Sequence, residues 1–349
     1  MYWKVTESDG QGIIGTSVSM SQEQNMNSQD QKTVLVTGGS GYIGGMVCRL
    51  LVDSGHNVIN IDRKKKDIPG VTLYPFDIES KQIDGIIKLT QPDTIMHFAA
   101  DHEVGRSVLE PDVFYWNNVS NTIYLLNSAV RNGVKNFIFS SSSSVYGDIT
   151  EFPTTENSPK APMSPYGKTK SMVEDMLEDY AVAHNINYTA LRYFNAAGAD
   201  PEMQHGYNQE AASHIIPIVC RAILNKEPFE VFGDDYDTAD GTCERDYTHV
   251  FDIATAHLAA MHYLDDGGES GIFNIGANGT NSVKQVIDAF ERITGEQVPH
   301  TIAERRAGDP PKTWADNTKA REAFGWEPQY GLDDIVSHAW AWESKNHKN

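Results

Sequence analysis

A short apolar run at residues 34–37 (VLVT) leads directly into glycines at positions 38, 41 and 44 and then into a stretch of helical pattern. Gly38 permits a tight turn, Gly41 lets a pyrophosphate approach the backbone, and Gly44 lets helix and strand pack closely. The free amides at the start of such a helix face an anionic phosphate. This strand, turn and helix therefore predict a dinucleotide-binding α/β fold.

Short β-branched runs alternate with amphipathic stretches of helical length from Thr33 onward, the pattern of a parallel sheet with helices on both faces. We expect strands at residues 33–37, 57–61, 71–74, 94–98, 136–140 and 188–193, and helices near 42–53, 112–132 and 165–184. Later helical stretches, at 213–224, 250–264, 282–294 and 332–344, are separated by short strands. The expected architecture is a Rossmann-like, doubly wound parallel sheet with a smaller C-terminal α/β substrate lobe.

The 349 residues divide into three expected parts. Residues 1–31 are rich in Ser, Gln, Asn and Gly without periodicity, which is typical of a flexible extension. Residues 32–195 are expected to form the dinucleotide-binding domain. Residues 196–349 are expected to form mainly the substrate lobe, with some segments returning to the first domain.

Composition excludes several classes of partner. The formal net charge of -20 opposes binding to nucleic acid or to an anionic membrane. No apolar run approaches the roughly 20 residues that a membrane-spanning helix needs. The three cysteines are far apart, and none has the spacing of a metal ligand. We therefore expect a cytoplasmic protein without a metal site.

An acidic residue ends the second expected strand. Asp62 lies about 20 residues beyond the glycine-rich turn, where a carboxylate binds the ribose hydroxyls of NAD. The basic residues 63–66 that follow could hold the additional phosphate of NADP. Because the carboxylate of Asp62 would repel that phosphate, the sequence favours NAD.

Tyr166 and Lys170 lie four residues apart at the start of an expected helix and so share one face. A phenol has an ordinary pKa of about 10, and a nearby ammonium, together with the cationic nicotinamide ring of NAD, can lower it. Serines at 140–144 end the preceding strand, at the carboxyl edge of the sheet where α/β proteins bind ligands. The pattern predicts a proton-transfer site.

Nine segments together carry a resemblance to a known family: VTGGSGYIG, FDI, HFAA, NNV, KNFIFSSSSSVYGD, SPYGKTK, LRYFNAAGADP, FGDDYDTADGTCERDYTHV and RRAGDPPKTWAD. They resemble the extended short-chain dehydrogenase/reductase family and, within it, the NAD-dependent sugar-nucleotide epimerases, from about Thr33 to Lys345. The resemblance implies an isomerase that interconverts UDP-glucose and UDP-galactose through a transient 4-keto sugar. It also implies bound NAD and a homodimer.

The resemblance assigns roles to individual residues. Ser142, Tyr166 and Lys170 would form the catalytic set. The residues that would contact NAD are Gly38, Gly41, Tyr42, Ile43, Gly44, Asp62, Asp77, Ile78, Phe98, Ala99, Ala100, Asn118, Ser140, Tyr166, Lys170 and Tyr193. The substrate would contact Ser142, Tyr166, Asn195, His214, Phe232, Arg245, Arg306, Asp309 and Thr313, with the two arginines pairing with the UDP diphosphate.

Four positions depart from the family's pattern. Asp101 and His102 stand where many epimerases have a Lys or an aliphatic residue, and His214 replaces a common Asn. Thr313 stands where strict UDP-glucose/UDP-galactose epimerases often carry Tyr. A smaller side chain leaves volume beside carbon 2 of the sugar, so we hypothesise that UDP-GlcNAc and UDP-GalNAc are also accepted.

Alternative functions stay open at this point. A 4,6-dehydratase needs an Asp-Glu pair where this chain has Ser143 and Ser144, and a decarboxylating relative usually has Glu at the second position; both are disfavoured. A UDP-glucuronate or UDP-pentose 4-epimerase is an alternative within the family. A non-catalytic NAD-sensing module is an alternative of another class.

Overall fold

A computed structural model describes residues 31–79, 81–209, 212–306 and 310–347. The chain divides into two units, Met1–Gln31 and Lys32–Asn349, and the description below concerns the second. The flexible extension expected for the first unit therefore falls almost wholly outside the described residues and stays a prediction.

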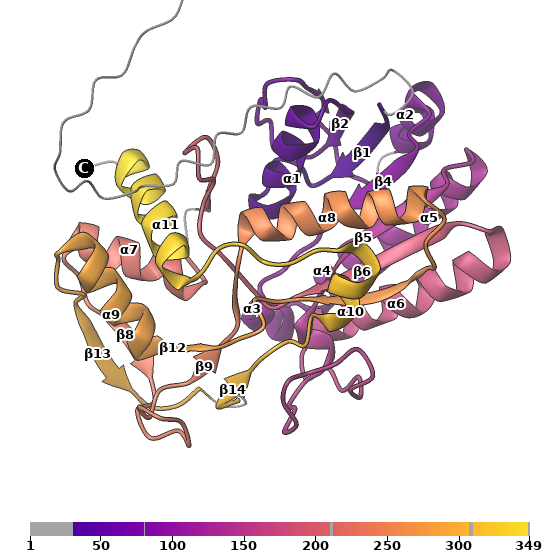
Figure 1. The fold of residues 1–349 in the computed structure, drawn as a ribbon. Coiled ribbons are helices and arrows are strands. Elements are labelled where there is room, and N and C mark those ends of the chain that lie inside the picture. Colours follow the sequence, from indigo (N-terminus) through magenta and orange to yellow (C-terminus); the bar gives the residue numbers. More distant parts are fainter. Residues whose placement is uncertain (1–30, 80, 210–211, 307–309, 348–349) are drawn as a thin grey trace, which may run out of the picture. The chain divides into compact units, whose positions relative to one another are not determined.

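A seven-stranded parallel sheet forms the centre of this unit (Figure 1), in the spatial order β11-β6-β5-β4-β1-β2-β3. The order reverses between β1 and β4, which is the topological switch point of a doubly wound fold. The strands are β1 (Thr33–Thr37), β2 (Asn57–Ile61), β3 (Val71–Tyr74), β4 (Thr94–His97), β5 (Asn136–Ser142), β6 (Asn187–Tyr193) and β11 (Gly271–Ile275).

The six strands expected from the sequence are all present, and β11 is a seventh that the sequence analysis did not assign to the sheet. Its residues Ile272–Ile275 pair in parallel with Ala190–Tyr193 of β6. A segment from the C-terminal half of the chain thus completes the edge of the central sheet, which agrees with the expectation that some segments return. The proposed boundary near Asn195 stays a prediction.

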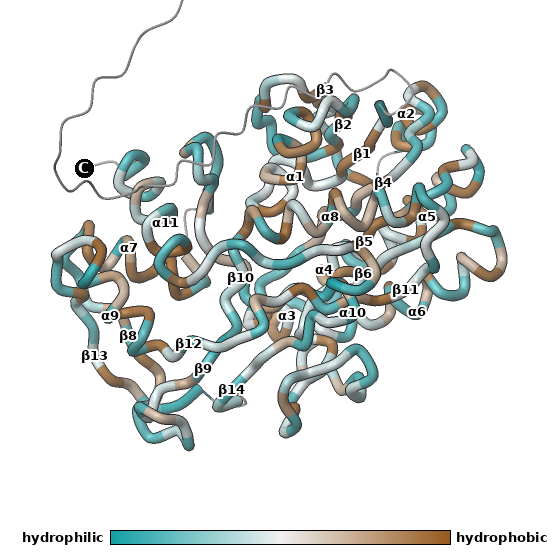
Figure 2. Tube along the Cα trace, viewed as in Figure 1, coloured by the Kyte–Doolittle hydropathy of each residue, from teal (hydrophilic) through white to brown (hydrophobic). Residues whose placement is uncertain are grey.

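Hydrophobic residues alternate between the two faces of the sheet, as strand geometry requires. Val34 and Val36 face one core with residues of α1 (Tyr42–Asp53), α8 (Val250–Asp265) and α10 (Thr318–Phe324). Leu35 faces the opposite core with residues of α2 (Gln82–Thr90), α5 (Asn121–Arg131) and α6 (Pro165–His184). Figure 2 shows hydrophobic colour along the central strands, in agreement with their burial.

The helix expected over residues 112–132 is interrupted. It consists of α4 (Pro111–Tyr115), a five-residue π-helix η1 (Trp116–Ser120) and α5. A π-turn inserts one extra residue and rotates the following side chains, and such turns occur often at functional sites. Asn118, a predicted cofactor contact, lies in η1 and is buried.

The smaller lobe has its own core between α7, α9 and α11, which lie together beside β8 and β13 in Figure 1. Its helices are α7 (Ile215–Asn225), α9 (Val283–Thr294) and α11 (Leu332–Asn346). Its short strands are β7 (Asn195–Ala197), β8 (Phe229–Phe232), β9 (Glu244–Arg245), β10 (Tyr247–His249), β12 (Asn281–Ser282), β13 (His300–Ala303) and β14 (Lys312–Thr313). The pairs are β10-β7 and β13-β8, and β12-β9-β14 forms a three-stranded sheet.

His97 at the end of β4 makes stability depend on pH. Its Nδ1 lies 2.7 Å from Thr37 Oγ1, and its Nε2 lies 2.9 Å from Thr122 Oγ1. Burial lowers the pKa of His97 to about 3. Below about pH 6.5 the unfolded chain therefore binds a proton that the folded chain excludes.

We predict that acid destabilises the protein through His97. Between pH 6.5 and 5 this residue should cost about 2 kcal/mol of unfolding free energy, at up to about 1.4 kcal/mol per pH unit. His97→Gln should flatten the pH dependence by that amount in denaturant unfolding, whatever its effect at pH 7. His300→Gln, at an exposed position of β13, should leave the dependence unchanged. Parallel curves for wild type and His97→Gln would contradict the assignment.

Candidate active site

The turn between β1 and α1 has no room for side chains. Gly38 has φ +77°, and a Cβ there would lie 2.7 Å from the Ala99 amide nitrogen. A Cβ on Gly44 would lie 2.4 Å from the Gly38 carbonyl oxygen. Gly41 precedes α1 and provides no side-chain cap. The first amides of α1 are thus left for an external anion, as the sequence predicted.

Asp62 follows β2 and lies against this turn. Its Oδ2 accepts the Ser40 amide at 2.9 Å, and its Oδ1 accepts the Lys64 amide at 2.7 Å. Each carboxylate oxygen keeps acceptor capacity for a ribose hydroxyl. Arg63 extends toward Asp77 and Asp101, at 3.9 and 3.8 Å.

The basic segment 63–66 is partly engaged by protein groups. Besides Arg63, Lys66 has its Nζ 2.9 Å from His205 Nδ1. A 2′-phosphate would have to compete with these contacts and with the carboxylate of Asp62. This geometry agrees with the preference for NAD over NADP.

Other predicted cofactor residues lie where neighbouring strands end. Phe98, Ala99 and Ala100 follow β4, and Asp77 and Ile78 follow β3. Asn118 is tied into the fold, because its side chain accepts the Asp101 amide and donates to the Asp101 carbonyl and to Thr169 Oγ1. Ile43 packs against the core, and the hydroxyl of Tyr42 donates to the Gly198 carbonyl at 2.6 Å. Tyr42 therefore joins the sheet domain to the smaller lobe.

The Ser-Tyr-Lys set meets between β5 and α6. Ser164 caps α6 by accepting the Gly167 amide, and Pro165 occupies the first turn, so Tyr166 and Lys170 lie one turn apart. Lys170 Nζ donates to the Ser140 carbonyl at 2.6 Å and lies 5.7 Å from the centre of the Tyr166 ring. Ser142 ends β5 on the side of Tyr166, to which it is hydrogen-bonded.

Burial shifts both titrating groups toward their neutral forms. It raises the pKa of Tyr166, while the hydrogen bond with Ser142 lowers it. Burial lowers the pKa of Lys170 to about 7, while the charge of Glu174 raises it. The sequence argument considered only the attraction between phenolate and ammonium. In the structure desolvation is the larger effect, so formation of the phenolate requires further positive charge at this place.

Tyr193 is held beside the set by a histidine. Its hydroxyl lies 2.6 Å from His257 Nε2, and His257 Nδ1 lies 2.8 Å from the Ile253 carbonyl oxygen. The ring of His257 lies 4.7 Å from that of Phe98. Because Nδ1 donates to the carbonyl, Nε2 accepts from Tyr193. The sequence analysis missed His257, since it lies 64 residues from Tyr193 in the chain.

Asn195, Arg245 and Thr313 come together in the smaller lobe. Arg245 and Thr313 are register partners in β9 and β14. The side chain of Asn195 donates to the carbonyl of Asp246, next to Arg245, at 2.8 Å. Three predicted substrate residues, far apart in sequence, thus converge.

A second pair forms at the end of β8, where the guanidinium of Arg306 stacks 4.0 Å from the centre of the Phe232 ring. Such stacking holds a guanidinium plane in one orientation. The predicted substrate residue Asp309 lies outside the described residues.

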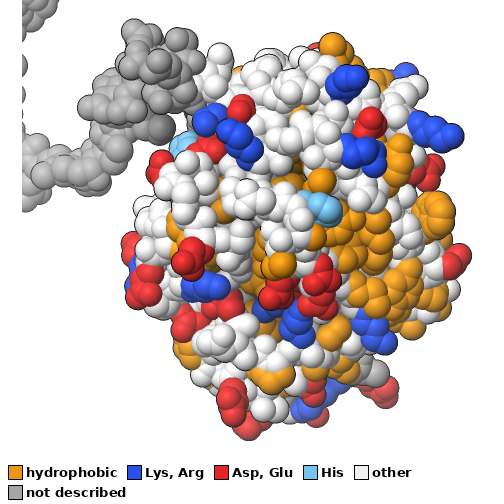
Figure 3. Space-filling model, turned by 90° about the vertical axis from the view of Figure 1, so that its right-hand side faces the viewer, with side chains coloured by type: hydrophobic (Ala, Val, Ile, Leu, Met, Phe, Trp, Pro, Cys, Tyr) orange, Lys and Arg blue, Asp and Glu red, His pale blue; other side chains and the backbone are white. Residues whose placement is uncertain are grey.

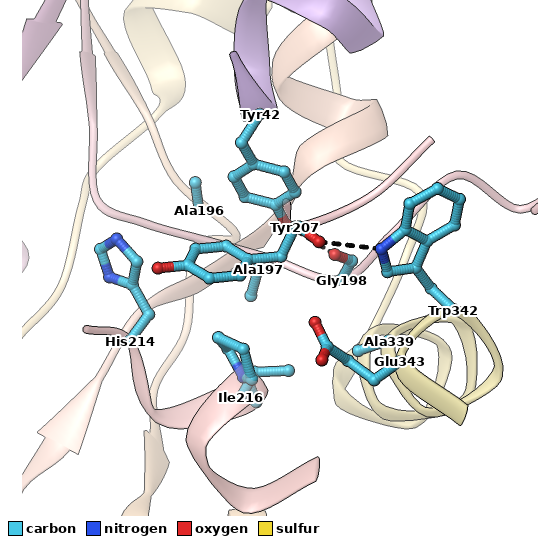
Figure 4. Close-up of a pocket in the computed structure, with 11 residues that line it drawn as sticks. Tyr42, Ala196, Ala197, Gly198, Tyr207, His214, Ile216, Ala339, Trp342 and Glu343 are labelled. Atoms are coloured by element: carbon cyan, nitrogen blue, oxygen red, sulfur yellow. Dashed lines mark hydrogen bonds between the residues drawn. The ribbon is translucent and has the colours of Figure 1, made fainter. Parts of the chain in front are cut away.

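His214 lies apart from these pairs, at the start of α7. Figure 4 shows its ring facing Tyr207 and Tyr42 around a small cavity that Trp342 and Glu343 also line. The Trp342 indole donates to the Tyr207 carbonyl at 2.9 Å. Burial lowers the pKa of His214 to about 4, so it contributes a neutral imidazole near pH 7.

His102, the other histidine that departs from the family's pattern, contacts Gln209. The His102 Nε2 atom lies 3.0 Å from Gln209 Nε2.

Sequence reasoning also missed a buried ion pair beneath the Ser-Tyr-Lys set. Glu174 and Arg192 are each 1% exposed, and Arg192 Nη2 lies 2.7 Å from Glu174 Oε2. Arg192 stands in the segment LRYFNAAGADP, which was interpreted through Tyr193, and Glu174 stands in the helix that was interpreted through Tyr166. The four-residue interval from Lys170 to Glu174 was the one sequence feature that could have indicated that Glu174 lies on the same helix face. Among the described residues, no group of three or more His, Cys, Asp or Glu side chains is suited to a metal ion.

A parallel sheet with a glycine-rich turn at its switch point and a Ser-Tyr-Lys set at its carboxyl edge defines a dinucleotide-dependent enzyme of the Rossmann type. The comparison with protein families shows to which family the chain belongs. Residues 34–276 match the NAD dependent epimerase/dehydratase family, to which the chain belongs.

Individual relatives agree along nearly the full length of the chain. The chain is 43% identical to the UDP-glucose 4-epimerase of Halalkalibacterium halodurans over 320 residues, which cover 90% of this chain and 96% of the relative. A solved UDP-glucose 4-epimerase from Brucella ovis in complex with NAD superposes with TM-score 0.86 at 38% identity, covering 89% of this chain and 98% of that one. The UDP-Glc/GlcNAc 4-epimerase of Campylobacter jejuni superposes with TM-score 0.79 at 36% identity, covering 90% of this chain and 99% of that one. These relatives favour the hexose epimerase interpretation over the uronate, pentose and sensing alternatives.

Proposed function

We propose that the chain is an NAD-dependent UDP-glucose 4-epimerase that interconverts UDP-glucose and UDP-galactose. The observation that carries this proposal is the placement of Tyr166 between Ser142 and Lys170 at the end of β5. A phenol in that position can remove a proton from a sugar hydroxyl. The names of the relatives support the substrate and the carbon at which it is inverted.

NAD fits the glycine-rich turn and the residues around it. The tight approach of Gly38 to Ala99 and of Gly44 to Gly38 leaves backbone amides for the pyrophosphate. Asp62 would hold the adenosine ribose, and Lys170 the nicotinamide ribose. When bound, NAD supplies a reversible acceptor for the hydride at carbon 4 and a positive charge beside the phenol.

The protein's own groups move the proton. Tyr166 takes it from the 4-hydroxyl, and Ser142 hydrogen-bonds to the phenol and shares the transfer. Lys170 keeps its ammonium beside the phenolate. The 4-keto sugar then turns in the cleft and presents its opposite face, and Tyr166 returns the proton there.

Arginine side chains would anchor the substrate while the sugar turns. Arg245 and Arg306 suit the diphosphate, because a guanidinium binds phosphate oxygens in a bidentate manner. Phe232 keeps Arg306 in its stacked orientation. Asn195 and Thr313 lie beside Arg245 and would face the sugar, and His214 would contribute from α7. Asp309 stays a predicted substrate contact.

Dehydration remains disfavoured by the residues next to Ser142. Ser143 and Ser144 form a short 3-10 turn, and the Ser144 amide donates to Ser142 Oγ at 3.2 Å. A hydroxyl there cannot replace the acid that elimination of water needs.

The three cysteines are free and buried. Free thiols suit a reducing compartment, and we place the protein in the cytoplasm. Among the described helices, none is long and apolar enough to cross a membrane.

We predict that Tyr166→Phe lowers epimerisation of UDP-galactose by at least about 100-fold, because positioned proton transfer contributes about 10²–10⁴-fold. Bound NAD should be retained, since the glycine-rich turn is unchanged. Chromatography of the products measures epimerisation. The absorbance of reduced cofactor on addition of UDP-sugar measures whether NAD is retained. Full-speed interconversion by the variant would refute the proposed role, and no product from the wild type would refute the activity.

The position of Lys312 bears on which sugars fit beside Thr313. Lys312 Nζ lies 2.9 Å from Glu244 Oε2 and 5.2 Å from the centre of the Trp314 ring. Neighbouring residues of a strand point to opposite faces, so Lys312 extends away from the face of Thr313. Lys312 therefore does not occupy the face on which Thr313 lies, which supports the hypothesis that an N-acetyl group at carbon 2 is accepted. The dual specificity named for the Campylobacter relative agrees with this reading.

We predict that the wild type epimerises UDP-GlcNAc and that Thr313→Tyr lowers this activity about tenfold or more. Overpacking by a bulky side chain costs about 1–3 kcal/mol. UDP-galactose turnover should change by less than about threefold, since its carbon 2 carries only a hydroxyl. Lys312→Gln is the matched control and should leave the selectivity unchanged. A wild type that turns over UDP-galactose but no UDP-GlcNAc would end this hypothesis.

A homodimer would cover an apolar face of the sheet domain. Figure 3 shows hydrophobic side chains gathered on the side of the molecule where α5 and α6 lie. Large hydrophobic residues are exposed on the adjoining elements α3 (Val104–Leu109), η1, α5 and α6: Val108, Leu109, Trp116, Ile123, Met172 and Val182. A contiguous patch of this kind marks an interaction surface.

We predict that the purified protein sediments as a dimer and that Ile123→Glu shifts it to a monomer. A charge in the apolar centre of an interface leaves an ion unpaired. Ile302→Glu is the matched control, because Ile302 is exposed in β13 of the other lobe. Analytical ultracentrifugation at several concentrations measures the outcome. A monomeric wild type, or a dimer that Ile302→Glu disrupts equally, would count against this surface.

A further inference from the structure

Glu174 is a buried carboxylate that accepts three hydrogen bonds from two residues. Its Oε1 accepts from Ser141 Oγ at 2.6 Å and from Arg192 Nε at 2.8 Å. Its Oε2 accepts from Arg192 Nη2 at 2.7 Å. Arg192 lies 4.6 Å from the centre of the Tyr146 ring, whose hydroxyl donates to Asn274 on β11. The ion pair thus joins α6, β5 and β6.

Stability alone is a poor reason for this arrangement. Desolvation of a buried ion pair offsets much of its attraction, and replacement by apolar residues of similar volume is often neutral or stabilising. The pair does have a specific position. Ser141 and Arg192 are register partners of β5 and β6, and the next partners are Ser142 and Tyr193.

Helix α6 also places Glu174 in line with the proton-transfer residues. Tyr166, Lys170 and Glu174 follow one another at intervals of four residues, so they lie along one face of α6. Lys170 is buried, and its ammonium donates to the Ser140 carbonyl at 2.6 Å, one residue before Ser141. Glu174 is therefore tied to Ser141, which lies between Ser140 and Ser142, and is one helical turn from Lys170.

We propose that Glu174 is a positioning residue for the proton-transfer site. Through Ser141 and Arg192 it fixes the ends of β5 and β6 relative to α6. Its negative charge keeps the buried Lys170 in the ammonium form that the phenolate of Tyr166 needs. This inference rests on the proposed epimerase function.

Charges on every neighbouring element act on this site. Arg192 on β6 compensates Glu174 in part, and Lys160 Nζ lies 3.9 Å from Glu174 Oε2. Lys160 is also paired with Asp175, which draws it toward the surface. The remaining titratable groups near Lys170 or Glu174 are His97, His102 and Tyr188. Burial lowers the pKa of both histidines, so they are neutral near pH 7 and add little charge.

Glu174→Gln tests the charge with little change of shape. Without the carboxylate, Lys170 loses its proton more readily and Tyr166 loses a stabilising cation. We expect kcat for UDP-galactose at pH 7 to fall about tenfold or more, and the alkaline limb of the kcat profile, where Lys170 loses its proton, to move down by about one pH unit. The KM should change less than about threefold, because the residues proposed to anchor UDP lie in the other lobe. The loss relative to the wild type should shrink at lower pH, where Lys170 keeps its proton.

Two further variants separate this role from a purely structural one. Glu174→Gln/Arg192→Met removes both charges, so no unpaired ion is left in the core. We expect it to fold and to retain NAD, with kcat still reduced and the alkaline limb still displaced. Glu178→Gln, on an exposed residue one turn further along α6, should match the wild type throughout.

The outcomes are distinct. A wild type without epimerase activity refutes the proposed function and not the placement of Glu174. An active wild type together with a double variant that has wild-type kcat and pH profile overturns the inference. The same holds if Glu174→Gln lowers kcat with no displacement of the profile and the double variant restores it, because Glu174 would then serve only to neutralise Arg192.

Discussion

The close packing of three backbone segments, at the start of α1 and at the ends of β1 and β4, is the constraint on which the rest of this structure depends. Gly38 has no room for a Cβ because the backbone of Ala99 lies against it, and Gly44 has none because of Gly38. This contact brings the amino end of a helix to the switch point of the sheet, where neighbouring strands separate. The ends of β5 and β6 lie on the same edge, so the phosphate-binding turn and the proton-transfer site share one side of the sheet.

Local sequence patterns predicted much of this arrangement. Five of the six β-branched runs carry buried residues on both faces, whereas the edge strand β3 is only partly buried. The glycine intervals specify the turn by steric exclusion. Features that depend on tertiary contacts were not accessible. The π-helix that carries Asn118 has no local signature, and β11 is recognisable as a strand of the main sheet only once its pairing with β6 is known. The hydrogen bond from Tyr193 to His257 and the ion pair of Glu174 with Arg192 likewise join residues brought together only by folding.

The electrostatics of the site corrected a simple expectation. A lysine four residues from a tyrosine suggests an acidic phenol, yet burial pulls Tyr166 and Lys170 toward their neutral forms. A charge added beside these groups acts on them strongly, because the site is buried and its dielectric is low. A low dielectric thus makes the phenol sensitive to what binds beside it, which suits a group that must both accept and return a proton.

The interleaving of the chain has a consequence for biosynthesis. The sheet edge beside β6 is completed by β11, and the apolar face of α1 is covered by α8, both from the second half of the sequence. While the ribosome is still making residues 196–275, the first half therefore exposes an unpaired strand edge and an uncovered hydrophobic surface. Cooperative folding of the sheet must therefore wait until the later segment has been synthesised.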